Sequence, residues 1–383
     1  VDRRPADASR PAPGAVMGAA TSLRRRLTRS SGRPASLDAQ GTRGIHVAIT
    51  GVKNRSHLVY IASYVRTLVD GVTPIRVSFV AAPAFLASAA VTVDDARELL
   101  PQGGSVTVED GMPGWRFDDA ARCLYVAVGA PGLKAVARLR RANPTRRIDV
   151  VVTDEGIGSY ASRDSRRAAL ERHGTPAAKA AARTLVTAAI ARACTTLRWP
   201  TFRSVGSSWE VLPAVAAEFG RELGDARPGS DASAVILTQP VVDLGWCSPE
   251  AYLAYVRRLA DAAAAAGLRP LVRPHPAEDR ARYAEFDIML SRGTAELDPD
   301  VVRASLALGG PSTALINLSA MVGMPVVWVS EPSVAHLDTD VSPEQAGIFE
   351  AFLGERVPLD EVEREVSAVV SRGLEERGSD GRR

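Results

Sequence analysis

The sequence predicts an α/β protein with two Rossmann-like halves that face an interdomain cleft, preceded by a disordered N-terminal tail. Short apolar runs alternate with amphipathic segments from Ile45 onward, which is typical of parallel sheets covered by helices on both faces. The alternation starts a second time after a Pro/Gly-rich segment at 225–231. A length of 383 residues with 46% apolar residues suffices for two cores. We therefore expect a tail at 1–44, a first domain at 45–228 and a second at 229–383.

The tail carries most of the positive charge. Residues 1–44 contain nine arginines and three aspartates, a net charge of +6, so the remainder of this +3 chain carries −3. A solvated tail, or a start codon assigned too early, explains this segment most simply. The alternative is peripheral contact with an anionic membrane through residues 23–29. The mildly acidic body argues against nucleic acid as a partner.

Residue usage indicates the source and the compartment. Of 47 basic residues only Lys53, Lys134 and Lys179 are lysines, which favours a GC-rich genome such as that of an actinobacterium. Three widely spaced cysteines form neither a disulfide framework nor a zinc pattern. A reducing compartment is expected. Since neither an 18-residue apolar run nor a signal-peptide core is found, we expect a cytoplasmic protein, with a peripheral position at the inner face of the cell membrane as the alternative.

The first half is predicted to begin with a strand at 46–51 that ends in Thr50-Gly51. Apolar residues at helical spacing predict a helix over 56–72, on which His57 could line the cleft. The remaining expected strands are 75–81, 105–108 (an edge strand), 123–128 and 148–153, and the remaining helices 94–100, 132–141 and an Ala-rich one at 177–195. Residues 197–230 have mixed character.

The second half repeats this pattern. A helix over 249–265 has a capping serine at Ser248 and a stop signal at Gly267. The expected strands are 233–238, 268–273, 286–290, 302–308 and 325–330, and the further helices 314–322, 343–353 and 359–375. Because ligands of open α/β sheets bind at the carboxyl ends of the strands, the short motifs that follow the strands are the candidate sites.

The first candidate motif is Asp154-Glu155-Gly156, which follows the strand at 148–153. Gly156 permits a tight turn, and two adjacent carboxylates repel each other, which raises the basicity of one. This pattern fits a general base, although an acid at a strand end is also a common cap or loop residue.

The second candidate motif is Arg273-Pro274-His275-Pro276, at the end of the strand expected at 268–273. The prolines restrict the backbone around the imidazole, which could donate to a phosphate oxygen, and Arg273 suits phosphate as well. A structural histidine in a proline-rich turn explains the same pattern.

Two further candidate motifs follow strands of the second half. Gly309-Gly310-Pro311-Ser312-Thr313 opens a helix, where hydroxyls and backbone N–H groups favour a phosphate. A simple helix cap is the alternative. Thr238 and Gln239, in Leu237-Thr238-Gln239-Pro240, suit contact with a nucleotide or sugar, and a plain strand end fits equally.

Several enzyme classes lack their signatures here. The sequence contains no metal-ligand spacing of His, Asp and Glu, no GxSxG, no Walker A motif and no glycine-rich dinucleotide fingerprint. These absences weigh against hydrolases, kinases and dehydrogenases, and no metal or cofactor is expected.

Taken together, the four motifs resemble those of the bacterial sialyltransferases and polysialyltransferases of the GT-B type. That family carries a D/E-D/E-G motif, then an HP motif, then an S-S/T motif, matched here by Asp154-Glu155-Gly156, His275-Pro276 and Ser312-Thr313 over residues 45–335. Arg273 stands where relatives often have Lys, which keeps the charge. The resemblance implies an inverting, metal-independent transferase that uses a CMP-activated nonulosonic acid, such as sialic acid or Kdn. It favours Glu155 over Asp154 as base and assigns His275, Ser312 and Thr313 to the CMP phosphate.

We therefore expect an enzyme that transfers the sugar acid to a hydroxyl of a glycan acceptor, in the synthesis of a cell-surface polysaccharide such as a capsule. Three alternatives remain. One is a Kdo or glycerol-phosphate transferase of capsule or teichoic-acid synthesis. The others are a GT-B-like sugar-nucleotide epimerase and a homologue that binds nucleotide or glycan without turnover.

Overall fold

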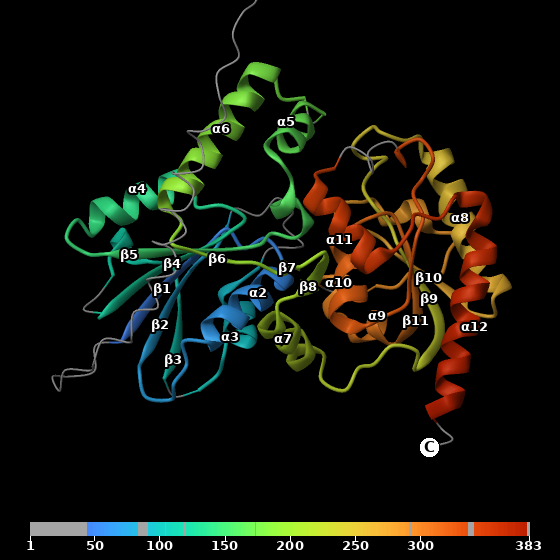
Figure 1. Cartoon of the computed structure of the whole chain (residues 1–383), viewed down its shortest axis with the longest axis horizontal. Coiled ribbons are helices and arrows are strands. Elements are labelled where there is room, and N and C mark those ends of the chain that lie inside the picture. The colour runs from blue at the N-terminus through green and yellow to red at the C-terminus, as the bar shows by residue number, and fades with distance from the viewer. Residues whose placement is uncertain are drawn as a thin grey trace, which may run out of the picture. The chain divides into compact units, whose positions relative to one another are not determined.

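The computed structural model describes residues 44–380, apart from 83–90, 104, 118–119, 173, 291–292 and 336–340 (Figure 1). The expected tail at 1–44 lies almost wholly outside the described residues. Residues 43–383 belong to one compact unit.

The first sheet has six parallel strands in the order β3-β2-β1-β4-β5-β6. Its chain order reverses between β1 and β4, which places a switch point at their carboxyl ends. The strands are β1 (Ile45–Thr50), β2 (Ile75–Val80), β3 (Val106–Asp110), β4 (Arg122–Val128), β5 (Ile148–Thr153) and β6 (Leu197–Trp199).

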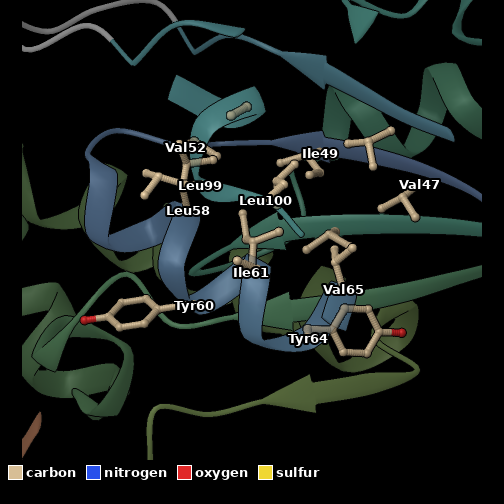
Figure 2. Packing of buried hydrophobic residues seen from close by; sticks show 14 of the residues in the cluster. Val47, Ile49, Val52, Leu58, Tyr60, Ile61, Tyr64, Val65, Leu99 and Leu100 are labelled. Carbon is tan, nitrogen blue, oxygen red and sulfur yellow. The ribbon is translucent and has the colours of Figure 1, made fainter. Parts of the chain in front are cut away.

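Helices cover both faces of this sheet. One face packs against α2 (Arg55–Arg66), α3 (Val93–Leu99) and α7 (Pro213–Leu223), where Figure 2 shows aliphatic side chains of α2 meeting those of β1. The other face packs against α4 (Leu133–Ala142) around the buried ring of Tyr125. Two further helices, α5 (Arg163–Arg172) and α6 (Ala177–Cys194), lie between β5 and β6 in the chain.

The second sheet has four parallel strands in the order β10-β9-β11-β12, with its switch point between β9 and β11. Its strands are β9 (Asp231–Leu237), β10 (Arg269–Arg273), β11 (Ala304–Gly309) and β12 (Val326–Trp328). One face packs against α8 (Pro249–Ala265) and α12 (Val362–Asp380). The other packs against α9 (Pro299–Arg303), α10 (Thr313–Val322) and α11 (Pro343–Leu353).

These two helix-covered parallel sheets confirm the predicted fold class, an α/β protein of the GT-B-like type. The predicted domain boundary near residue 228 stays a prediction, although β9 begins just beyond it at Asp231. Ser248 caps α8 as expected, because its side chain accepts from the N–H of Ala251 at 3.2 Å.

Several elements differ from the sequence-based expectation, among them the unexpected helices α5 and α9. The strand expected at 286–290 forms only an isolated bridge from Ile288 to Val272, because Pro270 has no N–H with which to extend the ladder. Helix α2 ends at Arg66 rather than at residue 72, because Asp70 accepts from the N–H groups of Val72 and Thr73 and closes a turn. The mixed segment 197–230 contains β6, α7 and a short antiparallel hairpin of β7 (Phe202–Val205) and β8 (Ser208–Val211).

The described part of the chain contains no helix whose length and apolarity would suffice to cross a bilayer.

Candidate functional site

A cleft of about 960 Å³ lies where carboxyl ends of strands from both sheets meet. The first half contributes the segment after β1, the start of α2, and Glu155 after β5. The second half contributes the residues that follow β9, β10 and β11, together with the first turn of α10. Both switch points therefore open toward one cavity, where an α/β fold offers backbone N–H groups to a ligand.

Most of the predicted site residues line this cavity, although they come from four segments of the chain. Those that line it are Glu155, Thr238, Gln239, Arg273, His275, Pro276, Ser312 and Thr313. Asp154 and Gly310 are not among the lining residues. The structure thus brings the three motifs together, while the chemical role of each residue stays a prediction.

The two adjacent acids of the first motif lie in opposite environments. Asp154 is 1% exposed and accepts hydrogen bonds from the Tyr160 hydroxyl, from the N–H of Thr201 at 2.7 Å and from Arg198 at 3.3 Å. Burial raises the pKa of Asp154, which the nearby Arg198 opposes. Asp154 therefore organises the segment beneath the motif, and its carboxylate has no open face toward the cleft.

Glu155, in contrast, is exposed to the cleft. Its carboxylate lies 3.4 Å from the Nζ atom of Lys53, and both side chains are well hydrated. Its backbone N–H donates to the Ser159 hydroxyl at 2.9 Å. Of the two acids, Glu155 is the one that a reactant in the cleft can contact.

A neutral histidine holds the backbone at Glu155. The Nδ1 atom of His57 accepts from the N–H of Lys53 at 3.2 Å, so the ring proton must be on Nε2, which donates to the Glu155 carbonyl at 3.3 Å. Burial lowers the pKa of His57 to about 4. At neutral pH the imidazole thus carries no charge and connects two backbone groups by hydrogen bonds.

Contacts from the second half also fix the chain after Glu155. Gly156 has φ +110, and a Cβ atom there would lie 2.5 Å from Oγ1 of Thr313, so only glycine fits this turn. The N–H of Ile157 donates to that same Oγ1 at 3.2 Å, and Gln345 donates to the Ile157 carbonyl at 3.3 Å. The Thr313 hydroxyl therefore accepts a hydrogen bond from the residue that follows the acidic motif, which the sequence did not suggest.

The His-Pro loop is shaped by a buried carboxylate. Glu278 accepts from the hydroxyls of Thr238 and Tyr283 and from the N–H of His275 at 2.9 Å. His275 Nδ1 accepts from the N–H of Ala277 at 3.1 Å, which leaves the Nε2 proton for a ligand. Partial burial lowers the pKa of His275, so its ring is neutral at pH 7 and offers a hydrogen bond.

Arg273 is placed differently from a free phosphate ligand. Its guanidinium is 8% exposed, lies 3.2 Å from the buried Asp298, and donates to the Gly293 carbonyl at 3.1 Å. Desolvation lowers the pKa of Arg273 and raises that of Asp298. The charge that the sequence offered to a phosphate is largely balanced inside the wall of the cleft.

The helix start at α10 supplies donors as expected. Ser312 is the N-cap, and its Oγ atom accepts from the N–H of Leu315 at 3.1 Å, so its own proton remains available. Gln239 donates to the Pro311 carbonyl at 3.2 Å, and a Cβ atom at Gly310 would lie 2.5 Å from the Gln239 side chain. Gly310 and Gln239 thus join the ends of β11 and β9 by close approach.

A polar network links the halves at the floor of the cleft and was missed from the sequence. Ser56 on α2 donates to Glu296 at 2.7 Å, and Asn317 on α10 donates to Glu296 at 3.0 Å and to the Tyr60 hydroxyl at 2.8 Å. Glu296 is 3% exposed. Figure 2 shows the Tyr60 hydroxyl pointing away from the labelled aliphatic side chains of α2.

The position of one missed group could have been found. Lys53 lies between the β1 end and Asn54, which caps α2 by accepting from the N–H of His57 at 3.0 Å. A strand, a short polar segment and a capping residue mark a strand-to-helix turn at the cleft edge. The partners Glu278, Glu296 and Asn317 give no such signal, because each becomes significant only through residues distant in the chain.

Groups of three or more His, Cys, Asp or Glu residues suited to a metal ion do not occur within the described ranges.

Comparisons with known proteins give fold-level likenesses only. No family model and no curated protein matches the chain. Among solved structures, E. coli heptosyltransferase WaaC with ADP matches with 13% identity, 87% of this chain, 99% of that chain and a TM-score of 0.38. The calicheamicin glycosyltransferase CalG4 matches with 13% identity, 86% and 89% coverage and a TM-score of 0.41. UDP-GlcNAc 2-epimerase from Methanocaldococcus jannaschii gives 12%, 82%, 93% and 0.39. Likenesses this loose do not identify an activity.

Proposed function

We propose that the protein is an inverting glycosyltransferase that moves a nonulosonic acid from a CMP-activated donor to a hydroxyl of a glycan acceptor. One observation supports this most. Glu155 from the first half and His275 and Ser312 from the second line the same cavity. A base and a set of phosphate-stabilising donors are the two components that such a transfer needs.

The proposed reaction assigns one role to each wall. Glu155 accepts the proton of the acceptor hydroxyl, whose oxygen then forms a bond to the anomeric carbon of the donor. The bond from that carbon to the phosphate oxygen breaks, and CMP leaves with the electron pair. His275 Nε2–H, the Ser312 hydroxyl and the first N–H groups of α10 stabilise the charge on the departing phosphate.

The position of Glu155 suits this role in three respects. Its carboxylate is open to the cleft, while its carbonyl and N–H are fixed by His57 and Ser159. The Nζ atom of Lys53 lies 3.4 Å from this carboxylate at the same edge of the cleft. Asp154 is engaged by three donors, so it supports the motif as a positioning residue.

The identity of the donor rests on the resemblance of the three motifs to bacterial sialyltransferases and polysialyltransferases. Under the same proposal the acceptor belongs to a cell-surface polysaccharide. A Kdo transferase remains the nearest alternative, because it would use the same kinds of group in the same places.

A nucleotide screen is the first test. The protein is melted in the presence of CMP, CDP, UDP or GDP, since a nucleotide that binds only the folded state raises the melting temperature. We expect CMP to give the largest increase. Release of CMP from CMP-sialic acid and CMP-Kdo, with and without a glycan acceptor, then separates the alternatives. A shift with UDP alone, or turnover of a UDP-sugar without an acceptor, would overturn the proposal.

A further inference from the structure

The hairpin of α5 and α6 is largely unpartnered within the described residues. Helix α6 has 18 residues, of which only Ala180 and Thr184 are buried, and α5 has no buried residue. Figure 1 shows α6 extending beyond the strands of the first sheet with α5 near its far end. The hairpin contributes little to the core, and the cleft does not include it.

The exposed face of α6 carries a stripe of apolar residues. Its exposed apolar residues follow the spacing i, i+4, i+7, i+8, i+11, i+15, which places them on one stripe of a helix. They are Ala178, Ala182, Leu185, Val186, Ala189 and Ala193. Leu185 is 59% and Val186 50% exposed. The less exposed side of α6 is apolar too, with Ala180, Ala188 and Ala191, so the helix is apolar all round and part of its apolar surface stays uncovered within the described residues.

Basic residues border this stripe on both sides. Lys179 and Arg183 lie along one edge and Arg192 along the other, all exposed, and α6 contains no acidic residue. Helix α5 adds the exposed Arg163, Arg167 and Arg172, whereas its acids are Asp164 and Glu171, and Glu171 is paired with Arg167 at 2.7 Å. The hairpin is thus strongly basic on a body that is acidic outside the N-terminal tail.

We propose that this hairpin docks on an anionic lipid surface. An apolar stripe bordered by basic residues is the pattern of a helix that lies in the bilayer interface, with aliphatic groups among acyl chains and cations at headgroup phosphates. A polyanionic glycan would use the cations and leave the stripe exposed. A second copy would bring two basic α6 helices together without an acid on either.

The hairpin is connected to the proposed reaction centre. Arg166 on α5 donates to the carbonyls of Ser159 at 2.9 Å and Ala161 at 3.1 Å, in the segment that follows Glu155. Ser159 in turn accepts from the Glu155 N–H. The docking element is therefore linked by hydrogen bonds to the segment that carries Glu155.

Vesicle binding by the full-length protein tests this proposal. Co-sedimentation is measured with phosphatidylcholine vesicles, with and without phosphatidylglycerol. Because each basic residue near an anionic surface strengthens partitioning by roughly fivefold, the triple variant Lys179→Gln, Arg183→Gln, Arg192→Gln is expected to bind anionic vesicles roughly a hundredfold more weakly. The matched control removes three cations from the second half: Arg257→Gln, Arg269→Gln, Arg372→Gln. It should bind like the wild type.

A second variant tests the apolar stripe. Leu185→Ser with Val186→Ser is expected to weaken binding by about tenfold or more at both low and high salt, because acyl-chain contact is not screened. Its melting temperature should stay unchanged, since both side chains are exposed.

Three outcomes would overturn the proposal. The first is an absence of binding by the wild type. The second is binding that survives both hairpin variants and is lost when Arg24, Arg25 and Arg26 become serine, which would assign docking to the tail. The third is a concentration-dependent dimer that the stripe variant abolishes in the absence of lipid, which would mean that a second copy covers this face.

Discussion

Substitution of the two adjacent acids separates chemistry from folding. In Glu155→Gln the side chain keeps its size and loses its charge. Loss of a general base typically slows transfer by about 10²–10⁴-fold. The ion pair with Lys53 is exposed, and such pairs contribute only about 0–1 kcal/mol, so the melting temperature should barely change.

Asp154→Ala should have the opposite profile. The buried N–H of Thr201 loses its acceptor, which costs about 1–3 kcal/mol, and the hydrogen bonds from Tyr160 and Arg198 are lost as well. Tyr160 retains its bond to the Phe202 carbonyl at 2.9 Å, and half-exposed Arg198 can be hydrated. A total of about 2–4 kcal/mol follows, which lowers the melting temperature of a unit of this size by roughly 3–6 °C.

The assay pairs a thermal melt with the initial rate of CMP release, measured well below the melting temperature of each variant. CMP affinity should remain close to the wild-type value in Glu155→Gln, because the proposed nucleotide contacts lie in the second half. Wild-type turnover by Glu155→Gln would refute its role as base. An unchanged melting temperature for Asp154→Ala would refute the structural role derived from its three donors.

Three further predictions concern the second half and the buried His57. His275→Ala should weaken CMP binding more than Ser312→Ala, whose backbone donors remain, and calorimetry on the double variant should show non-additive losses if both groups contact one phosphate. Asp298→Ala strands the buried Arg273 charge and should cost about 3–5 kcal/mol; an unshifted urea midpoint would contradict the pair. His57 has a pKa of about 4 when folded and 6.5 otherwise, so the unfolded chain binds more protons between these values. His57 should therefore lower stability by about 3 kcal/mol as pH drops from 6.5 toward 4, and His57→Gln should remove this part of the slope while leaving that of His46, whose pKa burial also lowers to about 4.

The sequence alone determined the order of the elements and the positions of the motifs. Apolar strands of limited length and helical periodicity are local properties, so β5, α8 and α11 could be located within a few residues. The rule that ligands bind at the carboxyl ends of parallel strands then predicted that Glu155, His275 and Ser312 lie at one cleft.

Only the tertiary structure decided which of these groups are free to act. Asp154 and Glu155 are adjacent in the chain, yet Tyr160, Thr201 and Arg198 enclose one carboxylate and leave the other in the cleft. Arg273 and Thr313 line the cleft as well, and only the structure shows that Arg273 also pairs with Asp298 and that Thr313 accepts from the N–H of Ile157. Burial and pairing depend on residues far apart in the chain. For the same reason, the outward apolar stripe of α6 is visible only once its exposed face is known.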